Sequence, residues 1–303
     1  MDSLKVCGDL LYKCFMKLTK HAMHALFRCD IETLKDVPQP FLLLSNHTTD
    51  YDTAFLAVAA REPVSFVATE NILRMGFIGR FAVRAFKPII HYKGTMGIAT
   101  SKNIISSIKN GKSVAMFPEG NRSFNGVTCP IPPATAKLAR MSKGTLVTYR
   151  LVGGYFSSPR WAGTLRKGRI TGRIAGVYPP EALKAMSVEE IQHVIENDLH
   201  VDAYEEQRVK KLAFRGRKRA EHLESTLFMC PICGKTGTLK SRGSCLFCEC
   251  GFKAEYDEYG MLNSPQRSYT ITELDRRQRE KVGELCREAG EGVVFEDGVF
   301  IQR

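Results

Sequence analysis

The sequence lacks any apolar run long enough to cross a membrane. Its longest uninterrupted apolar stretches are short, such as AFLAVAA at residues 54–60, whereas a spanning helix needs about 20 consecutive apolar residues. The N-terminal residues include Asp2 and Asp9 and contain no apolar core of the kind that a secretory signal peptide has. Internal repeats and low-complexity tracts are also absent. We therefore expect a folded protein that is either soluble or bound to the surface of a membrane.

Acidic residues are in short supply relative to basic ones. The chain has 32 Asp and Glu against 44 Lys and Arg, a net charge of +12, and its isoelectric point is about 9.2. Such a charge attracts anionic partners, namely nucleic acid, acidic membrane surfaces or phosphorylated substrates. Hydrophobic residues make up 44% of the 303 residues, which is enough for a sizeable core. The length then predicts one large domain with an appendage, or two domains.

The ten cysteines are unevenly distributed, since five of them lie between Cys230 and Cys250. Clustering of this kind indicates a metal site in a reducing compartment and not a disulfide framework. The segment Cys230-Pro-Ile-Cys233-Gly has the form of a zinc knuckle, in which a tight turn lets two thiolates bind one ion. Redox-active thiols or an iron–sulfur cluster are the other interpretations of this segment.

The second pair of metal ligands has two possible assignments. Cys245 and Cys248 form a C-x2-C pair, whereas Cys248 and Cys250 form a C-x-C pair followed by glycine. Because each knuckle needs a residue that tolerates positive φ, the glycines after Cys233 and Cys250 favour the second assignment. We therefore expect zinc at Cys230, Cys233, Cys248 and Cys250, with Cys245 as the alternative ligand. The site would be structural, because four thiolates leave no open coordination position.

Short apolar segments alternate with helical patterns between Pro38 and about Arg150. Strands that alternate with helices predict an α/β fold with a mixed sheet flanked by helices, whose ligands bind at the carboxyl ends of strands. The expected strands are 41–44, 63–68, 89–90, 113–117 and 145–152, and the expected helices are 53–61, 102–109 and 135–141. Further along, residues 160–178 have a strand pattern and residues 180–202 a helical one, with Ser187 and Glu190 spaced as a capping box.

The N-terminal residues 4–28 have the pattern of an amphipathic helix, which either packs on the body of the protein or lies in a membrane interface. We divide the chain into this segment at 1–35, a main domain at 36–222 and a small zinc-ribbon-like domain at 226–303. In the last domain we expect a helix over 272–289 and a hairpin turn at Asp297-Gly298.

Two segments of the main domain carry residues suited to catalysis. The first, Asn46-His47-Thr-Thr-Asp-Tyr-Asp52, follows an expected strand, and so does the second, Phe117-Pro-Glu-Gly-Asn-Arg-Ser123. A histidine with a nearby carboxylate can act as a general base, because the carboxylate fixes the tautomer and leaves the other ring nitrogen to accept a proton. The second segment combines a carboxylate, backbone N–H groups and a guanidinium, which suits a polyol that carries a phosphate.

Together these two segments resemble the marks of the glycerolipid acyltransferase family, which includes the 1-acylglycerol-3-phosphate and glycerol-3-phosphate acyltransferases. The family has an N-H-x4-D block followed by an F-P-E-G-(T/N)-R-S block. The match at both blocks is essentially complete, and the resemblance covers roughly residues 40–160. It implies transfer of an acyl group from acyl-CoA or acyl carrier protein to a glycerol hydroxyl, in phospholipid biosynthesis. A ribbon-like tail such as the one expected here resembles a bacterial subset of the family.

The resemblance also implies roles for individual residues. His47 would be the general base and Asp52 its orienting partner. Six residues would belong to the acceptor-binding part of the site: Asn46, Arg80, Lys93, Glu119, Gly120 and Arg122. Lys93 stands where the family has an arginine, so it keeps the charge and loses the two-pronged donor, and Arg80 is a second candidate for that role. Tyr149 stands about where the family often has a proline, which leaves the acyl-chain end of the site undetermined.

The alternative function is a zinc-ribbon protein that binds nucleic acid through the basic residues 210–219. That stretch has no aromatic residue other than Phe214, and runs of charge are usually solvated surfaces. We therefore expect an O-acyltransferase with 1-acylglycerol-3-phosphate as the leading acceptor. Its partners would be the acyl thioester and an anionic membrane surface, with no nucleic acid. We expect it in the cytoplasm, at the inner face of the cell membrane.

Overall fold

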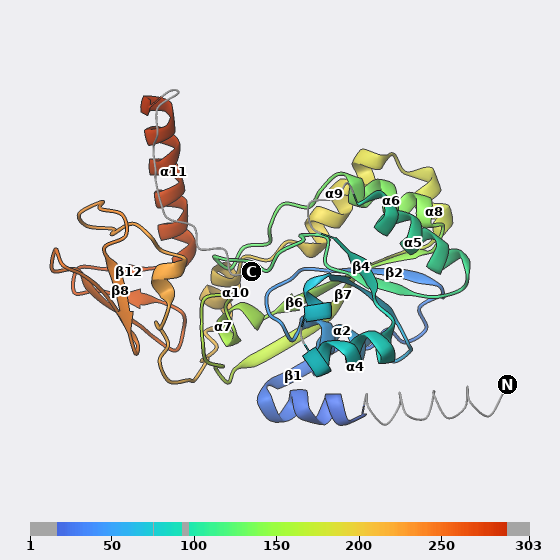
Figure 1. The fold of residues 1–303 in the computed structure, drawn as a ribbon, viewed down its shortest axis with the longest axis horizontal. Helices are drawn as coiled ribbons and strands as arrows, with labels where there is room; N and C mark the ends of the chain where they lie inside the picture. Colours follow the sequence, from blue (N-terminus) through green and yellow to red (C-terminus); the bar gives the residue numbers. More distant parts are fainter. Residues whose placement is uncertain (1–16, 75, 93–96, 290–303) are drawn as a thin grey trace. The chain divides into compact units, whose positions relative to one another are not determined.

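The computed structural model describes residues 17–74, 76–92 and 97–289 (Figure 1). The chain divides into two compact units, the first formed by Met1–Arg160 and Leu165–Gly216 and the second by Trp161–Thr164 and Arg217–Arg303. The first part of the expected N-terminal helix and the expected hairpin at Asp297-Gly298 lie outside the described residues. The described part of that helix covers residues 17–26.

The described residues of the first unit form a seven-stranded sheet in the order β1-β7-β6-β2-β5-β3-β4. The pair β6–β7 is antiparallel and the other neighbours are parallel. The mixed sheet predicted from the alternating pattern is therefore present. Its strands are β1 Arg28–Ile31, β2 Phe41–Ser45, β3 Ser65–Thr69, β4 Ile89–His91, β5 Val114–Met116, β6 Thr145–Val152 and β7 Arg169–Tyr178.

Strand β2 is buried along its whole length, because helices cover both faces of the sheet. Successive side chains of a strand point to opposite faces. Phe41 and Leu43 accordingly pack with Phe55 of α2 (Asp52–Ala60), whereas Leu42 and Leu44 pack in a separate core on the other face. An apolar run without alternation is what a strand covered on both faces requires.

The helices of the first unit lie in two layers. Helices α5, α6, α8 and α9 lie on one side of the sheet, and α2 and α4 lie on the other (Figure 1). Three further helices, α3, α7 and α10, have at most eight residues each. The bounds are α3 Asn71–Arg74, α4 Gly76–Phe86, α5 Ile98–Lys109, α6 Ala134–Ser142, α7 Gly154–Ser157, α8 Pro180–Ala185, α9 Val188–Leu199 and α10 Ala203–Lys210.

Two expected elements differ from the structure in their extent. A strand is expected over 160–178, but β7 begins only at Arg169. The residues before it form turns, bends and an isolated bridge at Lys167. The expected helix over 180–202 is two helices, since Met186 and Ser187 adopt extended backbone between α8 and α9. Ser187 and Glu190 form the capping box that their spacing predicts, and this begins a new helix.

The second unit is a small antiparallel sheet followed by a long helix. The five strands pair in the order β12-β11-β10-β9-β8. Its elements are the 3-10 helix Leu223–Ser225, β8 Leu239–Arg242, β9 Cys245–Cys248, β10 Lys253–Tyr256, β11 Leu262–Asn263, β12 Ser268–Tyr269 and α11 Ile271–Ala289.

Candidate functional site

The two sequence blocks meet because their strands are neighbours. Strands β2 and β5 pair in parallel, with Leu44 opposite Met116, so both chains leave the same edge of the sheet. The His47 backbone carbonyl accepts a hydrogen bond from the backbone N–H of Ser123 at 2.9 Å. His47 and Glu119, 72 positions apart in the sequence, are also hydrogen-bonded, so the two blocks line one site.

The Asp52 carboxylate, which is 1% exposed, fixes the ring of His47. Asp52 Oδ2 lies 2.9 Å from His47 Nδ1 and also accepts from the backbone N–H groups of Thr48 at 2.5 Å and Thr49 at 2.8 Å. Its other oxygen accepts from the Thr49 hydroxyl at 2.9 Å. Asp52 is also the first residue of α2, where the helix dipole favours a negative charge. A carboxylate facing Nδ1 places the proton on that nitrogen and leaves Nε2 as a proton acceptor.

The other side of the His47 ring is packed against an aromatic residue of the second block. The ring stacks on Phe117 with centroids 4.1 Å apart and planes inclined by 15°. The His47 side chain remains 21% exposed, so the ring is held from two directions and still reachable. No described residue forms a hydrogen bond with its Nε2.

Glu119 connects the two loops through the backbone. Its Oε1 accepts from the N–H of His47 at 2.6 Å, and its Oε2 accepts from the N–H of Cys129 at 2.5 Å. Burial raises the pKa of Glu119 to about 7, although these hydrogen bonds lower it. The sequence suggested that this carboxylate would contact the acceptor. Both of its oxygens accept from backbone groups, which ties the loop of His47 to the second block, and its contact with the acceptor stays a prediction.

Asn46 is also engaged with the backbone of the protein. Its side-chain amide donates to the carbonyl of Leu151 and its side-chain oxygen accepts from the N–H of Leu151, both at 2.8 Å. This pair joins the loop after β2 to the neighbouring strand β6. The place of Asn46 in the acceptor-binding part of the site stays a prediction.

Arg122 is the cation that the second block presents to solvent near His47. Its Nη1 donates to Asp50 Oδ2 at 2.8 Å, and the Arg122 side chain is 23% exposed. Gly120 has a φ of +69°, and a Cβ added there would meet no atom within 4 Å. The glycine thus serves the conformation of the turn, because other residues rarely adopt this φ. Arg80 lies on α4 with an exposed side chain, and Lys93 lies outside the described residues.

Comparison with known proteins finds a family model that matches part of this unit. Residues 28–152 match the acyltransferase family model. The resemblance to the acyltransferases is confirmed. We call the first unit the acyltransferase unit from here on.

The fold of the acyltransferase unit also has a counterpart among solved structures. The crystal structure of the 1-acyl-sn-glycerophosphate (LPA) acyltransferase PlsC from Thermotoga maritima is similar, with a TM-score of 0.57 and 20% sequence identity. The match covers 66% of this chain and 80% of that chain. No curated protein matches the chain in sequence. No helix in the described ranges is both long and apolar enough to cross a membrane.

Four cysteines of the second unit gather in one place. The sulfur atoms of Cys230, Cys233, Cys248 and Cys250 all lie within 4.8 Å of one another. The Sγ atoms of Cys230 and Cys250 are 3.6 Å apart, and those of Cys233 and Cys248 are 3.9 Å apart. Zn–S bonds of about 2.3 Å in a tetrahedron give sulfur separations of about 3.8 Å, so this donor set fits zinc. Cys245 is not part of the group.

The knuckle turns hold these thiols in place. Gly234 and Gly251 follow Cys233 and Cys250 with φ of +69° and +93°. The N–H of Gly234 donates to the carbonyl of Cys230 at 3.0 Å, and the N–H of Gly251 donates to that of Cys248 at 3.1 Å. Both turns therefore use the freedom of glycine that the sequence suggested.

Several residues that contact the candidate site residues were given no role of their own by the sequence. Thr48 and Thr49 bind Asp52, Phe117 stacks on His47, and Asp50 pairs with Arg122. The two threonines lie just before a helix, where a turn of Ser or Thr is common. All four residues lie within the two sequence blocks, which is the signal that could have pointed to them.

Proposed function

We propose that this protein transfers a fatty acyl group from an acyl thioester to a hydroxyl of a glycerol phosphate or lysophospholipid. The leading acceptor is 1-acylglycerol-3-phosphate, as in phospholipid biosynthesis. The observation that carries the proposal is the contact between His47 Nδ1 and Asp52 Oδ2 at 2.9 Å, which leaves Nε2 facing away from the carboxylate. The acyltransferase family match and the PlsC-like fold support the reaction class.

In the proposed reaction His47 Nε2 takes the proton of the acceptor hydroxyl while its oxygen attacks the thioester carbonyl. A C–O bond forms, and the C–S bond breaks as the tetrahedral intermediate collapses. The proton passes from His47 to the leaving sulfur, so that one ester and one thiol result. Asp52 stabilises the positively charged ring between these steps and keeps its tautomer. The thioester is already activated, so no nucleophilic side chain is needed.

We assign the phosphate of the acceptor to the cations beside the catalytic loop. Arg122 is one of them, because it pairs with Asp50, three residues after His47. A guanidinium can bind two phosphate oxygens at once. Lys93 and Arg80 remain candidates for the same group, as the family resemblance implies.

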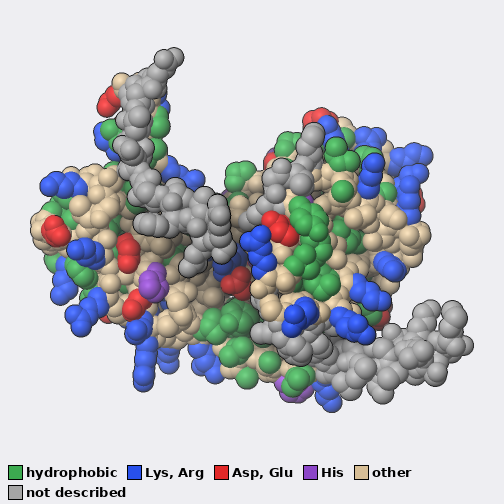
Figure 2. Space-filling model, viewed as in Figure 1, with side chains coloured by type: hydrophobic (Ala, Val, Ile, Leu, Met, Phe, Trp, Pro, Cys, Tyr) green, Lys and Arg blue, Asp and Glu red, His purple; other side chains and the backbone are tan. Residues whose placement is uncertain are grey.

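The described N-terminal helix supports a position at a membrane surface. Met23 and Phe27 are buried against the body of the unit, whereas Leu18 is 69% exposed and Leu26 is 44% exposed. An exposed apolar stripe beside basic residues suits the interface of an anionic bilayer. Figure 2 shows Lys and Arg side chains spread over the face of the acyltransferase unit. We therefore propose a peripheral protein at the inner face of the cell membrane.

The reaction is tested by turnover with a panel of substrates. Acyl-CoA and acyl carrier protein thioesters would each be offered with glycerol-3-phosphate, 1-acylglycerol-3-phosphate and neutral lysolipids. Thiol release with ester formation supports the proposal, and it should be lost in His47→Ala. If none of these pairs is turned over while the protein is folded, the proposed reaction is wrong.

Membrane binding is tested by flotation with vesicles. Binding to anionic vesicles should weaken with salt and again in Leu18→Ser/Leu26→Ser, whereas neutral vesicles should bind weakly. Equal binding to both kinds of vesicle at any salt concentration would contradict an electrostatic interface.

A further inference from the structure

A basic pocket lies at the outer edge of the acyltransferase sheet, away from the residues assigned so far. It has a volume of about 870 Å³ and lies between the end of the N-terminal helix, the edge strand β1, the start of β7 and residues 212–215. Its charged lining consists of Arg28, Asp30, Lys167, Arg169 and Arg215, with His24 beside them.

Backbone pairing holds these cations in like-charged pairs. Arg28 lies directly opposite Arg169 in the β1–β7 ladder. Lys167 lies opposite Arg215 in an isolated bridge, whose two N–H···O bonds measure 2.7 and 2.9 Å. Like charges at opposed positions destabilise a sheet. A structure that places two such pairs around one pocket is therefore suited to an anion that lies between them.

Asp30, the carboxylate in this lining, is already engaged. It accepts from Arg169 at 3.0 Å and from Arg173 at 2.6 Å. These two arginines hold the pKa of Asp30 below its ordinary value. Two guanidinium groups on one carboxylate leave an excess of positive charge, and Arg28 and Lys167 add to it without an acidic partner among the described residues.

Close packing of the backbone sets the shape of the pocket. Phe214 lies on Gly168, where an added Cβ would come within 2.0 Å of its ring. Phe214 is buried against Phe156, with ring centroids 5.3 Å apart. The absence of a side chain at Gly168 thus lets residues 212–215 lie against the start of β7, and this contact brings Lys167 and Arg215 together.

The pocket opens on the same edge of the sheet as the catalytic loop. Asn46 is bonded to Leu151, Leu151 lies opposite Gly172, and Gly172 lies opposite Ile31. Strands β1 and β7 run antiparallel to β2 and β6, so the first residues of β1 and β7 lie at the sheet edge where β2 and β6 end. Arg28 and Arg169 are these first residues, and they therefore lie at the edge from which the loop of His47 leaves β2. Three strand spacings separate β1 from β2, about 14 Å. A pantetheine arm has a length of that order.

We propose that this pocket binds a phosphate of the acyl donor, while the donor's pantetheine arm reaches His47. Both kinds of donor, coenzyme A and acyl carrier protein, carry a phosphate at the end of that arm. The inference rests on the proposed acyl transfer. Arginine and lysine in pairs provide the charge-assisted hydrogen bonds that phosphate oxygens accept.

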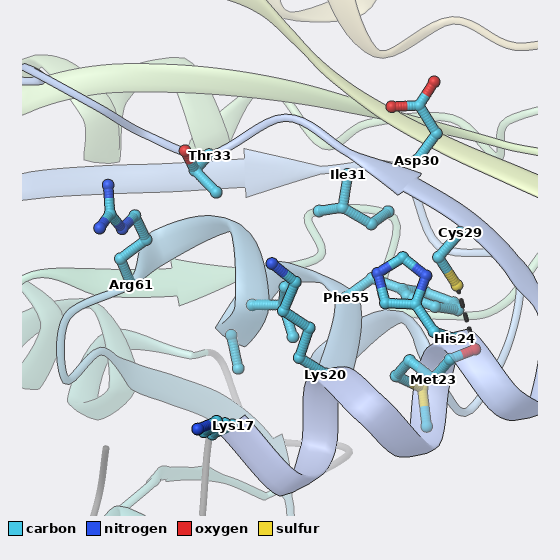
Figure 3. A pocket seen from close by; sticks show the side chains of 12 residues that line it. Lys17, Lys20, Met23, His24, Cys29, Asp30, Ile31, Thr33, Phe55 and Arg61 are labelled. Carbon is cyan, nitrogen blue, oxygen red and sulfur yellow. Dashed lines mark hydrogen bonds between the residues drawn. The ribbon is translucent and has the colours of Figure 1, made fainter. Parts of the chain in front are cut away.

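A neighbouring cavity extends the basic surface toward the N-terminal helix (Figure 3). It has a volume of about 500 Å³ and shares His24, Cys29 and Asp30 with the pocket. Lys17 and Lys20 enter it from the helix and Arg61 from the end of α2 (Figure 3). The thiol of Cys29 donates to the carbonyl of Met23 at 3.3 Å, and burial raises its pKa to about 11, so it is no nucleophile. These cations add to the potential that attracts a polyphosphorylated donor.

The test compares donors with and without phosphate. In Arg28→Gln/Lys167→Gln we expect the KM for acyl-CoA to rise about tenfold or more, because charge-assisted hydrogen bonds are lost. The kcat should be unchanged, and so should the KM for acyl-pantetheine, which has the arm and no phosphate. Coenzyme A should raise the melting temperature of the wild type and not that of the variant. Lys102→Gln/Lys137→Gln, which removes two exposed charges from α5 and α6, is the matched control and should behave as the wild type.

The outcomes separate this proposal from the proposed reaction. An unchanged KM for acyl-CoA and for acyl carrier protein thioester in the variant would overturn it. If the variant instead lost only its binding to anionic vesicles, the phosphate would be that of a lipid headgroup and the donor assignment would be wrong. A third outcome is that the wild type transfers no acyl group while only the variant loses the rise in melting temperature with coenzyme A. In that case the proposed reaction would be wrong, and the assignment of the pocket to a donor phosphate would be supported.

Discussion

The acyltransferase unit encloses its sheet between two apolar cores, whereas the second unit has five short strands and a cluster of four cysteines. A unit of the first kind buries enough apolar surface to fold without help. Small units with little core usually need a metal or disulfides. The comparison indicates that the two units depend on different interactions for their stability.

The charge is as unevenly divided as the core. Residues 217–303 contain 14 Lys and Arg and 14 Asp and Glu, so the excess of +12 lies entirely in the acyltransferase unit. A unit without net charge gives no electrostatic support for nucleic-acid binding by that unit, since such binding depends on neutralising phosphates. The positive charge instead belongs to the unit that carries His47 and the basic pocket.

The largest effect is expected from the proposed catalytic pair, His47 and Asp52, and it should be confined to activity. His47→Ala should lower kcat by about 10²- to 10⁴-fold, because a general base supplies about that much. Asp52→Asn should be nearly as damaging, since it removes the acceptor that fixes the tautomer. Initial rates and thermal unfolding would be measured together, with His193→Ala on α9 as the control. Wild-type kcat in His47→Ala would contradict the mechanism.

Metal removal should affect the second unit and spare the first. Cys230→Ser should lose the zinc, of which we expect one per chain, and unfold residues 226–260, because metal binding and folding are coupled in small zinc domains. Elemental content and hydrogen exchange of each unit would show this, and Cys245→Ser, outside the cluster, should keep the metal. A preparation that contains no zinc, or an iron–sulfur absorption band, would refute the assignment.

A smaller effect concerns the buried carboxylate that joins the catalytic loops. The pKa of Glu119 in the folded protein is about 7, above the ordinary value of about 4.3, so the folded state binds the proton more tightly than the unfolded state. The resulting stability is complete below the unfolded pKa and is lost as pH rises through 7, by up to about 4 kcal/mol.

Glu119→Gln should remove this dependence of stability on pH between about 4.3 and 7. Denaturant unfolding at several pH values measures it. Glu189→Gln, an exposed change on α9, should keep the wild-type profile. The same slope in wild type and Glu119→Gln would show that the carboxyl is not the group that titrates.

The smallest effect should come from the cation beside the site. Arg122→Ala should raise the KM for a phosphorylated acceptor about tenfold, with a change of less than about 1 kcal/mol in unfolding free energy, because its partner Asp50 is exposed. Asp50→Asn breaks the same ion pair and keeps the guanidinium, so its KM should stay at or below the wild-type value. Equal KM values in Arg122→Ala and wild type would indicate that Lys93 or Arg80 binds the phosphate instead.

Much of this protein could be predicted from local sequence. The apolar run of β2 and the helix that follows it are visible in order, and so are His47 and Asp52 at the junction between them. The four expected metal ligands are likewise close in sequence and meet in space. Such features depend on residues a few positions apart, whose geometry is set by strand, turn and helix formation.

Tertiary structure alone decided what lies across the sheet. The bonds of Glu119 to the N–H of His47 and of Asn46 to Leu151 join residues 72 and 105 positions apart. The basic pocket depends on the order β1-β7-β6-β2, which brings Arg28 beside Arg169. Pairing between distant strands is chosen by the packing of the whole core, and no local pattern records it.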